Sequence, residues 1–134
     1  MIRRVLRRLC CWNRTGRPVT AGASLLIGAA AERSAERHLR WRGWRIVARN
    51  WIGGGGELDL VASRWRTLLV VEVRRRASAE AAFRSVDADK LARTQSSAAA
   101  LVHRHGLERY RLRIDVIAVD EAGRIHRHRD VVGR

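Results

Sequence analysis

An almost unbroken run of apolar residues near the middle of the chain constrains the fold more than any other feature. Residues 68–73 are Leu-Leu-Val-Val-Glu-Val. A strand without a polar face needs cover on both sides, so this run predicts a central strand in a sheet flanked by helices. Glu72 is the exception within the run, and an acid that is nearly buried is rarely left without a partner.

The segments on either side of this run complete an α/β domain. Apolar residues at helical spacing predict a helix over residues 21–42, and Asp87 and Gly106 mark the two ends of a second helix. Strands are predicted over residues 44–51, 57–62, 67–74 and 111–119, with a short edge strand over 124–128. Glycines 53–56 are expected to form a flexible connector. The order α-β-β-β-α-β predicts a single domain over residues 21–134 with a mixed central sheet.

The chain is strongly basic, which indicates a polyanionic partner. Its 134 residues include 28 Lys and Arg against 13 Asp and Glu, a formal charge of +15, and Lys90 is the only lysine. The excess persists when both ends are left out, so it favours nucleic acid first and an anionic membrane second. Residues 1–20 are predicted to be a flexible basic arm, either an electrostatic contact for DNA or membrane or a frayed end.

Composition and cysteine usage exclude several classes of protein. Hydrophobic residues make up 46% and charged residues 31%, which are proportions of a globular chain and not of a disordered one. Cys10 and Cys11 are adjacent, so they form neither a disulfide framework nor a Cys-x-x-Cys zinc site, and we expect a cytoplasmic protein. The apolar run over residues 19–31 is too short to cross a bilayer, so no integral membrane segment is expected.

Acidic residues occupy strand positions that should be apolar. Glu57 and Asp59 are two residues apart and leave the same face of a strand, as do Glu72 and Arg74. If the two strands pair as a hairpin, three carboxylates and one cation converge at one edge of the sheet. Such carboxylates repel one another unless a cation lies between them, and their hard oxygens suit Mg²⁺ or Mn²⁺. The pattern favours a metal site for phosphodiester hydrolysis, and a solvated hairpin with charged ends is the alternative.

The residues around these acids resemble a known family. The resemblance rests on GELDLVA at residues 56–62 and VVEVRRR at residues 70–76. These segments are similar to the YraN-like family of predicted endonucleases, which belongs to the PD-(D/E)xK superfamily and is related to archaeal Holliday-junction resolvases. Shorter matches extend the resemblance over about residues 22–132: Gly28 with Glu32, Ala35 and Leu39, then residues 43–50, Val86-Asp87 with Lys90, and residues 113–116.

This resemblance implies a restriction-endonuclease-like core and a metal-dependent, structure-selective DNA endonuclease. It implies that Asp59 and Glu72 hold Mg²⁺ or Mn²⁺, that Glu32 is a further ligand or holds water, and that Glu57 is an accessory acid. The expected substrate is branched or junction DNA. A homodimer is implied by analogy with resolvases, because a four-way junction offers two symmetric strands.

One position departs from the superfamily pattern. The lysine of the E-x-K motif is Arg74 here, and a guanidinium can grip phosphate but cannot act as a base. Three interpretations stay open. Arg74 orients water and stabilises charge well enough, or Lys90 reaches in from the second helix, or the protein is an accessory module that binds DNA or RNA and cuts slowly or not at all.

Candidate nucleic-acid contacts surround this site. Arg75 and Arg76 follow it directly and predict a track for phosphates, and Lys90 is a further candidate. Trp65 lies in the predicted hairpin turn beside Arg64, where it could stack on unpaired bases. Glycines 53–56 would let the backbone approach phosphate or let the hairpin swing.

Overall fold

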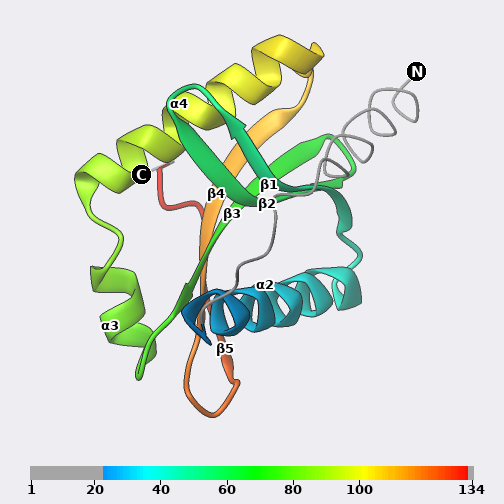
Figure 1. Cartoon of the computed structure of the whole chain (residues 1–134). Helices are drawn as coiled ribbons and strands as arrows, with labels where there is room; N and C mark the ends of the chain where they lie inside the picture. The colour runs from blue at the N-terminus through cyan, green and yellow to red at the C-terminus, as the bar shows by residue number, and fades with distance from the viewer. Residues whose placement is uncertain (1–22, 133–134) are drawn as a thin grey trace.

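The computed structural model describes residues 23–132, so the predicted arm over residues 1–20 lies outside the described part of the chain. Five strands form one sheet in the order β1-β2-β3-β4-β5 (Figure 1). The strands are β1 (Arg45–Gly53), β2 (Gly56–Arg64), β3 (Thr67–Arg75), β4 (Arg111–Val119) and β5 (Ile125–His128), and the helices are α2 (Ala23–Trp41), α3 (Ala79–Arg84) and α4 (Ala88–His105). Strands β3 and β4 are parallel and the other neighbours are antiparallel. The predicted α/β fold with a mixed sheet is therefore confirmed.

Helices cover both faces of the sheet, as the apolar central run predicts. Leu68 and Val70 of β3 belong to one buried core, to which α4 contributes. Leu69 and Val71 belong to a second core on the opposite face, which α2 contributes to (Figure 1). Because both faces of β3 are buried, the strand has no polar side. The alternating pattern of residues 44–51 predicts that Ile46 and Ala48 share one face, but a bulge in β1 between them places the two residues in different cores.

Helix α4, on the first face, begins and ends where the sequence predicts. Asp87 caps α4 by accepting a hydrogen bond from the backbone N–H of Lys90 at 2.8 Å, and Gly106 ends it with a φ of +63°. The short helix α3 was not predicted, because it is too short to show an apolar period. Within residues 23–132, no helix is both long and apolar enough to cross a membrane.

The β1–β2 hairpin leaves the sheet before it turns. The pairing of β2 with β3 ends at Leu60, whereas β2 stays paired with β1 as far as the turn. The free end of the hairpin bends over the side of the sheet that carries α4 (Figure 1). There the hydroxyls of Ser97 and Ser96 donate hydrogen bonds to the carbonyls of Gly53 and Gly54 at 2.7 and 2.8 Å.

The glycine turn is a packing contact, and not the flexible connector expected from the sequence. A Cβ atom on Gly54 would lie 2.7 Å from the Ser96 carbonyl oxygen and 2.8 Å from Ala100 Cβ. Gly54 also has a φ of +61°, a conformation that glycine adopts without steric cost. Glycine is required here because the backbone of the hairpin lies directly against α4.

A buried ion cluster ties β5 to the parallel pair of strands. Asp115 in β4 is fully buried and accepts hydrogen bonds from Arg113 at 3.0 Å and from Arg127 of β5 at 2.8 Å. The backbone N–H of Asp130 donates to the same carboxylate at 2.9 Å. The Trp44 ring lies beside both guanidinium groups, 5.3 and 5.8 Å from its centroid. A buried acid is thus fully paired, as a folded core requires.

Candidate active site

The candidate site lies where β2 separates from β3. Leu60 is the last residue of β2 that pairs with β3, and the next residue towards the turn is Asp59. Its Oδ2 accepts a hydrogen bond from the backbone N–H of Val73 at 2.9 Å. A side-chain carboxylate therefore takes the place of the carbonyl that a continued strand would offer. The break in the ladder brings Asp59 next to the end of β3, where the second acid lies.

Glu72 is the buried centre of the site. Its side chain is 4% exposed, and its Oε1 lies 3.1 Å from both the Lys90 Nζ and an Arg74 guanidinium nitrogen. Its other oxygen, Oε2, is buried and has no hydrogen-bond partner among residues 23–132. A buried oxygen of this kind calls for a partner that the described side chains do not supply.

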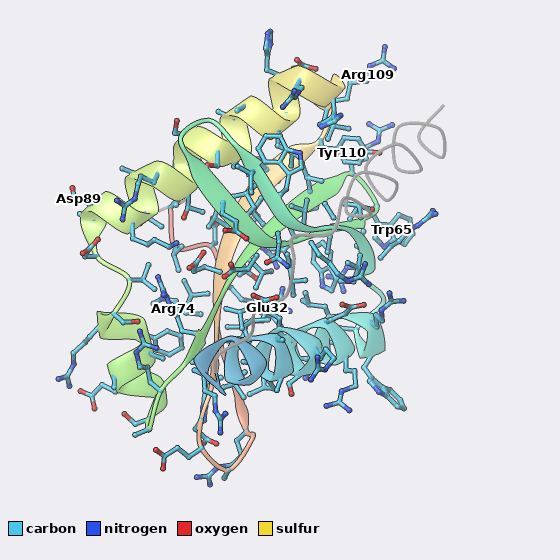
Figure 2. The ribbon with its side chains drawn as sticks, viewed as in Figure 1. Glu32, Trp65, Arg74, Asp89, Arg109 and Tyr110 are labelled. Carbon is cyan, nitrogen blue, oxygen red and sulfur yellow. The ribbon has the colours of Figure 1, made fainter. Side chains whose placement is uncertain are left out.

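Lys90 enters the site from the first turn of α4. Its backbone is fixed by the Asp87 cap, and its side chain crosses to Glu72 on β3. Lys90 therefore does reach in from the second helix, where it shares one carboxylate oxygen of Glu72 with Arg74. Arg74 lies in the space beside the end of β3, between the sheet and the helices α3 and α4 (Figure 2).

Two carboxyl groups in the site have strongly raised pKa values. Burial, then the neighbouring Glu72, raises the pKa of Asp59 to about 7, although the Val73 N–H and Lys90 act in the opposite direction. Burial, then the charge of Asp59, raises the pKa of Glu32 on α2 to about 7. Both carboxyl groups are therefore partly protonated near neutral pH, and a cation bound between them would favour their ionised forms.

Asn50 is a site residue that the sequence did not reveal. It lies in β1 with a φ of +48°, and its side chain donates a hydrogen bond to Glu32 that lowers the pKa of that carboxyl group. Asparagine is uncommon in strands and tolerates positive φ better than most residues. An asparagine within a predicted strand was therefore the one sequence signal that could have marked this position as unusual. This hydrogen bond connects β1 with the Glu32 carboxyl group on α2.

The donor set fits an open site for a hard cation. Among residues 23–132, no three His, Cys, Asp or Glu side chains gather closely enough to form a complete metal cage. Asp59 and Glu72 are two adjacent carboxylates, and one has a buried, unpaired oxygen. Mg²⁺ is commonly held by one or two carboxylates, with water and phosphate oxygens in the other positions. Glu57 is exposed and contributes weaker repulsion to the Asp59 carboxyl group.

The other residues predicted to contact nucleic acid lie on two different sides of the molecule. Arg75 is half-buried and Arg76 is exposed at the end of β3, next to the site. Arg64 and Trp65 lie at the other end of the β2–β3 hairpin, about 17 and 20 Å from Asp59 at about 3.3 Å per strand residue. Figure 2 shows Trp65 on the far side of the molecule from Arg74. The structure thus brings Glu32, Asp59, Glu72, Arg74 and Lys90 together, but it does not bring Arg64 or Trp65 to them.

Comparison with known proteins identifies the family. The model of the uncharacterised protein family UPF0102 matches residues 31–119, a stretch that contains the five clustered residues. This chain belongs to the UPF0102, or YraN-like, family. A UPF0102 protein of Paenarthrobacter aurescens is 40% identical over 107 residues, which cover 78% of this chain and 88% of the relative.

Further UPF0102 proteins show similar agreement. The protein of Dinoroseobacter shibae is 39% identical over 105 residues, covering 75% of this chain and 76% of its own. That of Beutenbergia cavernae is 43% identical over 95 residues, covering 69% and 80%. The UPF0102 family is uncharacterised, so function has to be argued from the site itself.

Proposed function

We propose that this UPF0102 protein is a metal-dependent nuclease that hydrolyses phosphodiester bonds in branched DNA. The observation that carries the proposal is the meeting of Asp59 and Glu72 with two cations at the point where β2 leaves β3. Glu72 Oε2 is buried and has no hydrogen-bond partner among the described residues, which leaves it available to a bound cation. The formal charge of +15 supports a polyanionic substrate.

Asp59 and Glu72 would hold Mg²⁺ or Mn²⁺. When bound, the ion supplies a Lewis acid for a phosphate oxygen and lowers the pKa of a coordinated water molecule. The two carboxylates repel each other without it, and that repulsion contributes to the raised pKa of Asp59. Metal binding and ionisation of the site are therefore coupled.

Arg74, Lys90 and Glu32 would supply the other functions of the site. Arg74 can bind a phosphate oxygen through its guanidinium group, but a guanidinium does not serve as a base. Lys90 presents donors beside Glu72, where it can position water or stabilise charge that develops on the phosphate. Glu32, held by Asn50 and with a pKa of about 7, supplies a proton acceptor near neutral pH.

A cleavage assay tests this assignment. Labelled four-way junction, flap, single-stranded and plain duplex DNA are incubated with the protein in EDTA, Mg²⁺ or Mn²⁺. We expect cutting that requires metal, disappears in Asp59→Asn, and falls about 100-fold or more in Lys90→Ala. Glu80→Gln is the matched control, because Glu80 is an exposed acid on α3 whose partner is Arg84. Its activity should equal that of the wild type.

The same assay identifies the alternative function. A mobility shift without cutting would support a DNA- or RNA-binding accessory module whose site has lost its chemistry. If Arg74→Lys then gains activity, the arginine is the cause of the loss. Cutting that persists in Asp59→Asn would contradict the proposed site. Light scattering with and without junction DNA tests the predicted homodimer.

A further inference from the structure

Two identical Arg-Trp-Arg triplets lie outside the proposed active site. They occupy residues 40–42, at the end of α2, and residues 64–66, in the turn between β2 and β3. All six residues are exposed. Both tryptophans are far more exposed than is usual for this residue, 88% for Trp41 and 92% for Trp65. Tryptophans normally bury most of their ring, so this pair needs an explanation.

The fold joins the two triplets at one end of the sheet. An Arg64 guanidinium nitrogen donates a hydrogen bond to the Arg42 carbonyl at 2.7 Å, which connects the turn with the end of α2. The same guanidinium lies over the Trp44 ring, 4.4 Å from its centroid. Arg64, predicted as a nucleic-acid contact, therefore has a structural role that holds the triplets together. The joined triplets, residues 40–42 and 64–66, are called the Trp–Arg surface.

The conformation of Trp65 argues against a purely structural role. It is the first residue of a two-residue hairpin turn and has a φ of +54°. That position strongly favours glycine, because a side chain there is strained. Trp65 thus has an unfavourable backbone conformation and an almost fully exposed ring, and it gains little from packing. Strain of this kind persists where it serves a function.

The charge of the surface indicates which partner it fits. No carboxylate within residues 23–132 pairs with Arg42, Arg64 or Arg66, whereas Arg40 is paired with Glu36. Indole rings bracketed by guanidinium groups match a nucleic-acid strand with unpaired bases, where stacking and phosphate contacts alternate. Insertion into a membrane would instead require a continuous apolar face, and each ring here has an arginine on both sides in the chain.

We propose that the Trp–Arg surface binds unpaired bases of the DNA substrate by stacking them on Trp65 and Trp41. This inference deepens the proposed function, because it names the substrate feature that the nuclease recognises. Trp65 follows the end of β2, six residues after Asp59 and about 20 Å away. That distance equals about six base pairs of duplex at about 3.4 Å each. The substrate is therefore a duplex with a single-stranded segment about six base pairs from the cleaved bond.

Binding is tested without metal, so that its outcome does not depend on catalysis. Fluorescence anisotropy in EDTA compares a labelled duplex with a single-stranded tail and a blunt duplex of equal length. We expect Trp65→Ala to weaken binding of the tailed duplex about 5- to 100-fold and to leave the blunt duplex unchanged. Trp65→Phe, the matched control, keeps an aromatic face and should keep most of the affinity. Arg66→Gln should weaken both duplexes alike, as loss of a phosphate contact does.

Stability measurements separate function from folding. Trp65→Gly removes the strained side chain, so it should unfold at the same temperature as the wild type or higher while losing affinity for the tailed duplex. A lower unfolding temperature would overturn the proposal, because Trp65 would then support the fold. Equal effects of Trp65→Ala on both duplexes would also overturn it. So would Trp65-dependent binding to phosphatidylglycerol vesicles with no effect on DNA, which would assign the surface to a membrane.

A second experiment tests the distance between the stacked bases and the cleaved bond. Tailed duplexes are incubated with Mg²⁺ and the cut positions are mapped. Cuts about six base pairs from the start of the tail support the proposal, and cuts whose position ignores the tail contradict it. A protein that binds the tailed duplex through Trp65 but does not cut would sink the nuclease assignment and leave the base-stacking surface intact. The two failures are thus distinguishable.

Discussion

Replacing Gly54 with alanine should be among the most damaging small changes in this protein. The new Cβ would meet the Ser96 carbonyl oxygen at 2.7 Å and Ala100 Cβ at 2.8 Å, both on α4. The backbone φ of +61° adds a left-handed conformation that costs a non-glycine residue about 1–2 kcal/mol. Overpacking of this kind costs about 1–3 kcal/mol. The free energy of unfolding should therefore fall by about 2–5 kcal/mol.

Gly106→Ala separates these two contributions. Gly106 has a φ of +63°, nearly that of Gly54, but a Cβ atom there would meet nothing within 4 Å. The free energy of unfolding of Gly106→Ala should therefore fall only by the cost of the left-handed backbone conformation, about 1–2 kcal/mol. Urea unfolding followed by far-ultraviolet circular dichroism measures both variants. The difference between them is the free energy of the contact between the hairpin and α4, and equal losses would refute the docking role of the glycine turn.

The remaining predictions concern charged groups. Asp59 has a folded pKa of about 7, above its ordinary value of 3.8, so its ionisation destabilises the fold as pH rises through this interval. Asp59→Asn should therefore unfold at a higher temperature than the wild type at pH 8 in EDTA, with the gain vanishing near pH 4; a constant gain would contradict this. Added Mg²⁺ should raise the unfolding temperature of the wild type but not of Glu72→Gln, as thermal scans across a metal titration would show. Asp115→Ala leaves Arg113 and Arg127 without their shared buried partner, and urea unfolding should show a loss of about 3–5 kcal/mol.

Sequence patterns predicted the elements whose signals are local. Asp87 and Gly106 delimit α4 because a cap depends on residues within one turn, and the apolar run of β3 depends on its own composition. The acids Asp59 and Glu72 stood out for the same reason, since each interrupts an apolar strand. Their meeting followed from pairing the two strands as a hairpin.

Features that depend on packing between distant segments were not predicted. The glycine turn lies on α4 because Ser96 and Ser97, more than 40 residues later, donate to its carbonyls. The bulge in β1 inserts one residue, so that the side chains after it point to the opposite face of the sheet. An alternating pattern of apolar residues does not show where such an inserted residue lies. Lys90 stayed one of three alternatives, because its reach to Glu72 depends on how α4 sits on the sheet.

The route of the chain between β3 and β4 ties the assembly of the candidate site to the completion of folding. Lys90 lies on the connection that carries the chain from β3 back to its parallel neighbour β4, and such a crossover forms only when long-range contacts close. Residues 32–74 already contain the four other clustered side chains. Without α4, however, the Lys90 ammonium group is missing, and the β1–β2 hairpin lacks the helix against which it packs. During synthesis the chain passes through states in which the acids exist and the site does not. The cluster of charged side chains is therefore completed in the same step as the native fold.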